Sequence, residues 1–408
     1  MSDDRGRAVR RVMSDSVWSI AGLVLMNAVA QFAVYPVWNR ELGNERYGTI
    51  LYLISAMNIL AISMGMACNY ARMRQSAEGP TRNSIYNRLM WIVSGAAVPY
   101  AGLIYALSGT VGADTAETAL FMALTILTMW RFYADVEYRL SLNYRGYFLY
   151  YLAVSAGYGI GILLFLRTGL WPLALIPGEA AGLAAVAWKG SIFRRDSLPG
   201  DEEKRQTVKA VAVLLGTNVV NNLVFNGDRV LLSFLMNGTA VTIYYQASLL
   251  GKTMTLITTP LNSVLMGYLA RYKGGLSRRM MNAVTAAAAA AVPAVTAACV
   301  LASHILIRML YPQNYELVRE WFWLANAAQV AYFVSGVVST LLLRYGRIRY
   351  QMYINLVYAG LFAALCIPGT LLGGMKGFCW SLLAVCLLRL AYVIFLGYRT
   401  AVSGEAAE

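Results

Sequence analysis

The segment LYLISAMNILAISMGMACNY, residues 51–70, contains no charged side chain. About 20 apolar residues span the hydrocarbon core of a bilayer. Inside lipid the backbone must satisfy its own hydrogen bonds, so such a segment is expected to be a helix. Eleven or twelve similar stretches, separated by short arginine-bearing loops, fill the chain from Ser16 to Tyr398. The sequence therefore predicts an all-α polytopic membrane protein.

Twelve membrane spans fit the pattern best. We place them at 16–38, 47–70, 88–108, 115–133, 146–166, 170–189, 208–234, 241–269, 282–304, 321–343, 351–372 and 376–398. Their alternation puts 25 of the 34 lysines and arginines in or beside the loops of one side, six on the opposite side and three within spans. The positive-inside rule makes the rich side cytoplasmic. Both termini are therefore expected in the cytoplasm.

A charged connection divides these spans six and six. The predicted parts are a cytoplasmic N-terminal tail (1–15), an N-lobe (16–189), a cytoplasmic linker (190–207), a C-lobe (208–398) and a cytoplasmic C-terminal tail (399–408). Such a split suggests two parallel lobes related by an axis along the membrane normal. No loop is long enough for a soluble catalytic domain, so any site must be built from helices.

The composition excludes several classes of function. The net charge of +14 lies in loops beside apolar spans, which argues against nucleic-acid binding. None of the five cysteines has CxxC spacing, and the lone histidine, His304, has no cysteine or histidine cluster around it, so no metal site or cofactor is expected. No Walker loop, HExxH or GxSxG motif indicates an ATP-driven pump or a hydrolase.

The seventh span carries the most unusual polar pattern. Asn218, Asn222 and Arg229 fall on one helical face, with Asp228 beside that face. Charged residues within a span usually face a bundle interior or a water-filled cavity. One interpretation is a cavity wall whose Arg229 attracts an anion. The alternative is that Asp228 pairs with a neighbouring cation while the asparagines bond between helices.

The eighth span continues this theme. Tyr245, Ser248, Lys252 and Thr255 share a face that also includes Thr259, and Pro260 follows as a predicted kink. Lys252 lies too deep to extend easily to the interface. The interpretation is again a lined cavity, with ordinary helix–helix contact as the alternative.

Polar residues elsewhere in the spans are fewer. The first span contributes Asn27 and Gln31 at helical spacing, which fits either a cavity wall or packing. Glu179 in the sixth span and Arg389 in the twelfth are single ionisable residues. Each is open to a structural or a substrate role. Asp228 and Glu179 are the carboxylates that would carry a coupling ion.

Three segments resemble a known family. They are YPVWNRELGNERYGTILYL (35–53), NGDRVLLSFLMNGTAVTIYYQASLLGKTMTLITTPLNSVLMGYLAR (226–271) and IRMLYPQNYE (307–316). Together they are similar to the Wzx-like polysaccharide-biosynthesis flippases of the MOP (multidrug/oligosaccharidyl-lipid/polysaccharide) exporter superfamily.

The resemblance implies a MATE/MOP-like bundle of two six-helix lobes around a central cavity, working by alternating access. Asp228 and Arg229 match the family's acidic–basic pair in the seventh helix, which implies a head-group role for Arg229. The lipid II branch has arginines in its first helix, whereas this sequence has Asn27 and Gln31. That difference favours another glycolipid as substrate.

The predicted function is translocation of a polyprenyl-diphosphate-linked oligosaccharide across the bacterial cytoplasmic membrane, for O-antigen, capsule or exopolysaccharide synthesis. Expected partners are membrane lipids and the polymerase and glycosyltransferases of the pathway, and related flippases act as monomers. No cofactor is expected beyond coupling to protons, sodium ions or the membrane potential. The alternatives are a MATE-like drug or cation antiporter and a membrane-embedded glycan polymerase or ligase.

Overall fold

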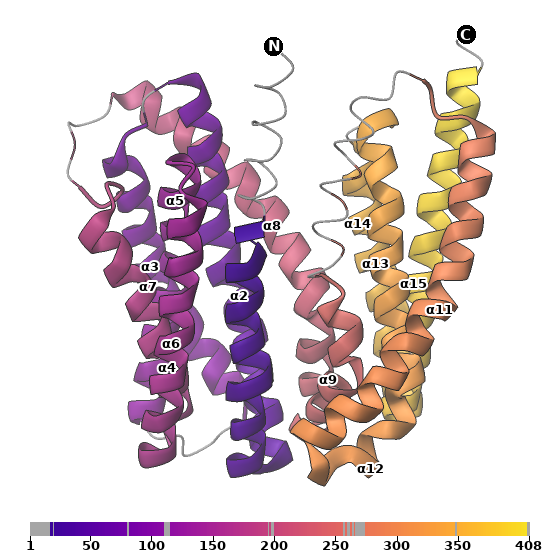
Figure 1. Cartoon of the computed structure of the whole chain (residues 1–408), viewed down its shortest axis with the longest axis horizontal. Helices are drawn as coiled ribbons and strands as arrows, with labels where there is room; N and C mark the ends of the chain where they lie inside the picture. The colour runs from indigo at the N-terminus through magenta and orange to yellow at the C-terminus, as the bar shows by residue number, and fades with distance from the viewer. Residues whose placement is uncertain are drawn as a thin grey trace. The chain divides into compact units, whose positions relative to one another are not determined.

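The computed structural model consists of helices throughout the part of the chain that it describes (Figure 1). The described residues are 17–405 except 19, 80, 110–114, 195, 197–199, 256–257, 259–261, 263–264, 266–273 and 347–348. Thr259 and Pro260, and the predicted kink at that proline, lie outside them. Eight of the described helices are long and apolar enough to cross a membrane. Their length and composition indicate a multi-pass membrane protein.

The chain divides into two compact units. Unit 1 contains residues 1–43 and 50–230, and unit 2 contains residues 44–49 and 231–408. The predicted N-lobe ended at residue 189, but α8 (Asp201–Leu235) belongs to unit 1 as far as Val230. Residues 44–49 belong to unit 2, although both of their chain neighbours belong to unit 1.

Unit 1 is a bundle of antiparallel helices connected by short turns. Besides α8, its helices are η1 (Ala30–Val34), α2 (Tyr35–Glu78), α3 (Asn83–Leu107), α4 (Thr115–Ala134), α5 (Val136–Leu140), α6 (Tyr144–Thr168), η2 (Trp171–Ala174) and α7 (Ile176–Lys189). The carboxamide of Asn143 accepts a hydrogen bond from the Gly146 N–H and thus caps the start of α6. Gly169 ends that helix in the left-handed conformation.

Close packing in unit 1 depends on small residues. A Cβ atom on Gly157 of α6 would lie 2.5 Å from the Cα of Gly178 in α7, and one on Gly161 would lie 2.2 Å from the carbonyl oxygen of Ala174. Glycines allow membrane helices to approach this closely and to pack along their backbones. α6 and α7 therefore form a tight pair, and α7 also packs against α4.

Unit 2 contains the remaining helices, several of which run side by side in Figure 1. They are α9 (Gly238–Thr253), α11 (Arg278–Leu310), η3 (Pro312–Asn314), α12 (Tyr315–Val318), η4 (Arg319–Trp321), α13 (Phe322–Tyr345), α14 (Arg349–Leu361), η5 (Phe362–Cys366) and α15 (Ile367–Glu405). α13 is central, because it packs against α9, α11 and α15.

Two predicted loops, 39–46 and 373–375, are replaced by kinks inside long helices. Gly43 (φ 75°) interrupts α2, and Gly374 (φ 53°) interrupts α15. A Cβ on Gly377 would lie 1.9 Å from the carbonyl oxygen of Gly369, so the chain reverses at Gly374. Glycine adopts a positive φ without the steric cost that other residues incur. At each kink the chain therefore turns where the sequence predicted a loop.

Candidate functional site

The polar face of α8 lies against α2 within unit 1. The carboxamide of Asn222 donates to the Ser63 hydroxyl (3.0 Å), and that of Asn218 lies 3.4 Å from the Ser63 carbonyl oxygen. The guanidinium of Arg229 donates to the Ser55 hydroxyl over 3.3 Å. Helical spacing thus predicted a shared face correctly. The two asparagines make the helix–helix hydrogen bonds of the alternative interpretation.

Asp228 and Arg229 are both buried, with exposures of 5% and 9%. The backbone N–H of Arg229 donates to the Asp228 carboxylate at 2.9 Å. Buried charges require compensation, because loss of hydration is costly in an apolar medium. Unit 1 therefore holds a fixed cation and a fixed anion side by side near the end of α8.

Glu179 belongs to a second buried charge pair in unit 1. Its carboxylate accepts hydrogen bonds from the Arg131 guanidinium and, at 2.7 Å, from the Tyr158 hydroxyl. Both charged side chains are only 3% exposed. Arg131 lies near the end of the predicted span 115–133 and is one of the 25 basic residues that the sequence places in or beside cytoplasmic loops. The structure instead makes it the buried partner of Glu179.

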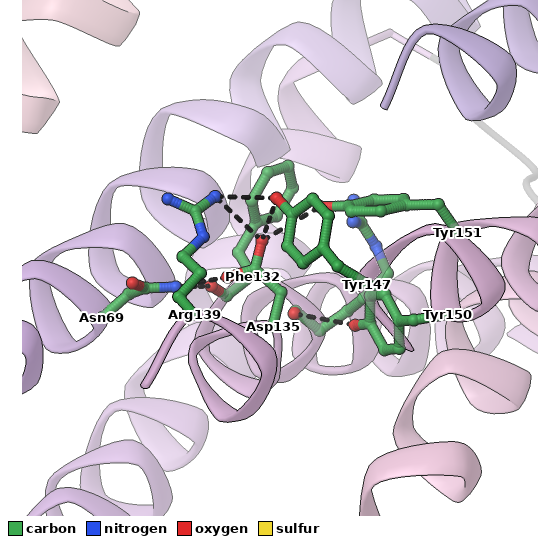
Figure 2. Close-up of polar contacts among 8 residues, drawn as sticks. Asn69, Phe132, Asp135, Arg139, Tyr147, Tyr150 and Tyr151 are labelled. Atoms are coloured by element: carbon green, nitrogen blue, oxygen red, sulfur yellow. Dashed lines mark hydrogen bonds and ion pairs between the residues drawn. The ribbon is translucent and has the colours of Figure 1, made fainter. Parts of the chain in front are cut away.

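A third polar cluster surrounds Asp135, where α4 gives way to α5 (Figure 2). Its carboxylate accepts from the hydroxyls of Tyr147 (3.2 Å) and Tyr151 (3.0 Å), from the Arg139 guanidinium (3.2 Å) and from the amide of Asn69. Four donors on α2, α5 and α6 thus satisfy one carboxylate. Asp135 lies between the predicted spans 115–133 and 146–166, so the sequence predicted a loop there and did not indicate a buried carboxylate.

Asn27 and Gln31 are the polar residues of the first predicted span. The amide of Asn27 donates to the Leu23 carbonyl of its own helix at 2.8 Å, and Gln31 lies in the π-helix η1. Both residues are half-buried. π-Helical turns are rare and frequently occur at functional sites. Pro36 follows this turn and, lacking an N–H group, explains the altered hydrogen bonding.

In unit 2 the predicted residues of α9 are almost completely buried. Tyr245 packs edge-on against Tyr47, and Ser248 is inaccessible to solvent. Lys252 is 8% exposed, and its backbone carbonyl accepts a hydrogen bond from the Thr255 hydroxyl at 2.9 Å. Ser248 and Lys252 thus lie in the second half of α9, Tyr245 lies at its middle, and Thr255 follows its end. Asn326 of α13 hydrogen-bonds to the backbone of the second half of α9, a contact that the sequence did not indicate.

Arg389 is the other buried cation of unit 2, at 6% exposure. It donates to the Tyr332 carbonyl (2.8 Å) and to the Ser335 hydroxyl, and its guanidinium carbon lies 4.3 Å from the centre of the Tyr332 ring. A carbonyl dipole, a hydroxyl and an aromatic face stabilise a positive charge without neutralising it.

The two units differ in the balance of their buried charges. Among the described residues, the buried charged residues of unit 1 are Arg72, Glu117, Arg131, Asp135, Glu179, Asp228 and Arg229, which include both signs. Those of unit 2 are Lys252 and Arg389, which are both cations. The sequence from 231 to 404 contains only two acidic residues, Glu316 and Glu320, and both precede the predicted span 321–343. The buried charges described in unit 2 are therefore cationic.

Residues 44–49 form the remaining polar feature of unit 2. Glu45 accepts hydrogen bonds from the backbone N–H groups of Gly238 (3.0 Å) and Thr239 (2.8 Å), where α9 begins. The Asn44 carbonyl accepts from the Thr242 hydroxyl at 2.6 Å. A carboxylate at a helix N-terminus satisfies free donors and complements the helix dipole. Gly48 contacts Gly238 directly, since a Cβ on Gly48 would overlap the Gly238 carbonyl.

No protein-family model and no curated protein matches the sequence. Solved structures match the fold. An inward-facing multidrug resistance MATE transporter of the MOP superfamily aligns with a TM-score of 0.69 and 13% identity, over 96% of this chain and 100% of that chain. The lipid II flippase MurJ, in its inward closed conformation, aligns with a TM-score of 0.70 and 14% identity, over 95% of this chain and 90% of that chain.

A third structure is a MOP superfamily transporter from Pyrococcus furiosus Vc1, described as having a reverse polarity of its binding pocket that suggests a different function. It aligns with a TM-score of 0.62 and 13% identity, over 96% of both chains. Identities this low establish the fold alone. The chain has the all-α MATE/MOP-like fold, so the predicted fold class is confirmed.

Proposed function

We propose that this protein is a flippase that moves a polyprenyl-diphosphate-linked oligosaccharide across the bacterial cytoplasmic membrane by alternating access. The observation that carries the proposal is the cationic character of the buried charges described in unit 2. Lys252 and Arg389 are buried there, and the sequence from 231 to 404 carries only two acidic residues against a larger number of lysines and arginines. An anionic ligand suits a unit with this excess of basic side chains.

A diphosphate-sugar head group fits this chemistry. It carries negative charge and many hydroxyls, so it cannot enter hydrocarbon without compensation. Lysine and arginine bind phosphate oxygens, and Asn, Gln, Ser, Thr and Tyr provide hydrogen bonds to sugars. We assign Arg229 and Lys252 to the diphosphate. Asn218, Asn222, Asn27, Gln31, Tyr245, Ser248 and Thr255 are the proposed polar lining.

The lipid II flippase MurJ has this fold, which supports a lipid-linked substrate. This sequence has Asn27 and Gln31 in the first helix, where the lipid II branch has arginines, and that difference favours a glycolipid other than lipid II. Within this proposal the protein serves surface polysaccharide synthesis, acts beside a polymerase and glycosyltransferases, and keeps both termini in the cytoplasm.

The energy source is proposed to be a proton, a sodium ion or the membrane potential, with Asp228 or Glu179 as the coupling carboxylate. Both carboxylates are buried and already accept hydrogen bonds, Glu179 from Arg131 and Tyr158 and Asp228 from the Arg229 N–H. A coupling ion would have to compete with those contacts at either residue.

Glycan export tests the proposal. The variants Arg229→Ala and Lys252→Ala are expected to abolish surface glycan while the protein still inserts at normal levels. Lys209→Ala provides a matched control, because this exposed lysine lies on the same helix as Arg229 but at its polar end. Normal surface glycan in both core variants would refute the assignment.

The second candidate is a MATE-like drug or cation antiporter, which the structural comparisons support equally. The buried carboxylates of unit 1, namely Asp135, Glu179 and Asp228, are the observation in its favour, because cation antiport needs anionic binding groups. Overexpression would then confer resistance to cationic dyes, and Asp228→Asn would remove it. Unchanged dye sensitivity together with loss of glycan in the null strain would exclude the antiporter.

A further inference from the structure

The side chain of Asn326 bridges the backbone of a neighbouring helix. Its amide nitrogen on α13 donates to the Ala247 carbonyl of α9 at 2.9 Å, and its oxygen accepts from the Gly251 N–H at 2.8 Å. These two backbone groups lie four residues apart, the spacing at which an α-helix joins its own N–H and C=O groups. Asn326 therefore gives each group a side-chain partner on the neighbouring helix. Asn326 is fully buried, so water does not compete for these bonds.

Gly251 makes this close approach of Asn326 sterically feasible. A Cβ atom at residue 251 would lie 2.8 Å from the Cβ of Gln329 and 3.0 Å from the amide oxygen of Asn326. Any larger residue would therefore push α13 away from α9. The neighbouring Gln329 donates to the Tyr244 hydroxyl at 2.9 Å and strengthens the same contact.

Lys252 lies in the last turn of α9, directly after Gly251. The hydrogen bonding of this turn tightens, because the Met254 N–H donates to the carbonyl of Gly251 at 3.3 Å, three residues back. The Thr255 hydroxyl donates to the carbonyl of Lys252 itself. Contacts on both sides thus fix the backbone of Lys252: Asn326 on the N-terminal side and Thr255 on the C-terminal side.

We propose that Asn326 is a positioning residue for Lys252 and sets the direction in which its ammonium approaches the diphosphate of the lipid-linked substrate. This inference rests on the proposed function. Lysine carries its charge on a flexible four-carbon stem, so the position of its backbone sets the region that the ammonium can reach. Asparagine suits the position because its amide supplies both donors and an acceptor; it also donates to the Phe322 carbonyl of its own helix at 2.8 Å. Leucine would supply neither donor nor acceptor.

The test follows Lys252 directly by NMR. The lysines of the full chain, held in nanodiscs, are reductively methylated with ¹³C, and the Lys252 signal is identified by its loss in Lys252→Arg. Inorganic pyrophosphate is then added as the probe. The variants are Asn326→Leu and Gly251→Ala, with Ser339→Ala as control, because Ser339 lies on the same helix and donates only within it.

We expect both variants to shift the Lys252 signal and to weaken pyrophosphate binding roughly tenfold, as when one charge-assisted hydrogen bond is misplaced. Ser339→Ala should change neither. A Lys252 signal that stays unshifted in a folded Asn326→Leu protein, or in Gly251→Ala if the former fails to fold, would overturn the inference. Shifted signals in a protein that never binds pyrophosphate would support the positioning of Lys252 while refuting its diphosphate role. The two claims are thereby separated.

Discussion

The buried pair of Arg131 and Glu179 allows a sharp test of whether Glu179 stabilises the fold or couples transport to an ion. The change is Glu179→Gln, which keeps the shape of the side chain and removes its charge. Gln can still accept one hydrogen bond, but the Arg131 guanidinium, 3% exposed, is left without its counter-charge. Removing one partner of a buried ion pair destabilises a protein by about 3–5 kcal/mol.

The packing around the pair indicates that Arg131 cannot move to a new partner in Glu179→Gln, so the lost stability will not be recovered. Arg131 lies on α4 and Glu179 on α7, and the Tyr150 hydroxyl also donates to the Arg131 carbonyl at 3.1 Å. The glycine contacts between α6 and α7 leave little space for the arginine to move towards water. We therefore expect a loss near the upper end of that range.

The assay is thermal unfolding in a mild detergent, followed by near-UV circular dichroism, with glycan export measured in parallel. The double variant Arg131→Met/Glu179→Leu removes both charges and should recover most of the stability, since apolar replacement of a buried pair is often neutral. The outcome that refutes the reasoning is an unfolding midpoint of Glu179→Gln equal to the parent. Loss of transport at unchanged stability would instead assign Glu179 to ion coupling.

Three further predictions concern other contacts. Gly48→Ala should destabilise unit 2 by about 1–3 kcal/mol in thermal unfolding, because its Cβ would lie 1.7 Å from the Gly238 carbonyl oxygen, whereas Gly336→Ala, with open space around it, should be neutral. Arg389→Leu should lower export more than Arg389→Lys, because only lysine keeps the charge above the Tyr332 ring; equal export would count against an electrostatic role. Burial raises the pKa of Asp196, but hydrogen bonds from Ser84 and the Asn83 N–H outweigh it and hold the pKa below the usual 3.8. The protection of those amides from hydrogen exchange should therefore persist above pH 3.8 and fall as the pH drops below it, whereas in Asp196→Asn it should be weaker and independent of pH over this range.

Hydropathy predicted most of the fold because the bilayer imposes its thickness on each helix. The span predicted at 115–133 is α4, Thr115–Ala134, almost to the residue. The prediction was less accurate where a glycine replaces a loop. At Gly43 and Gly374 the chain turns within a single residue, and hydropathy averaged over many residues cannot resolve such a turn.

The candidate site was predictable only in part. Helical spacing placed Asn222 and Arg229 on one face, but it could not identify Ser63 or Ser55 as their partners, because periodicity says nothing about the opposite helix. The same limit applies to Glu179, whose partner Arg131 lies 48 residues earlier in the chain. Asn326 had one available signal, because it is one of two amide side chains, with Gln329, in the largely apolar span 321–343. Whether the predicted residues bind substrate stays a prediction.

The membership of α8 in unit 1 bears on how this polypeptide can be divided experimentally. A break in the charged linker at 190–207 would fall between six hydrophobic segments and six, which makes it an obvious place to split the gene. The amino-terminal fragment would nevertheless lack the helix that completes it, including the Thr207 hydroxyl that contacts Gln75 and the amide of Asn222 that contacts Ser63. The carboxy-terminal fragment would lack the Glu45 carboxylate that caps α9. Neither half is self-sufficient, so co-expressed halves should accumulate only together, and reporter fusions after residue 235 should outperform fusions within the linker.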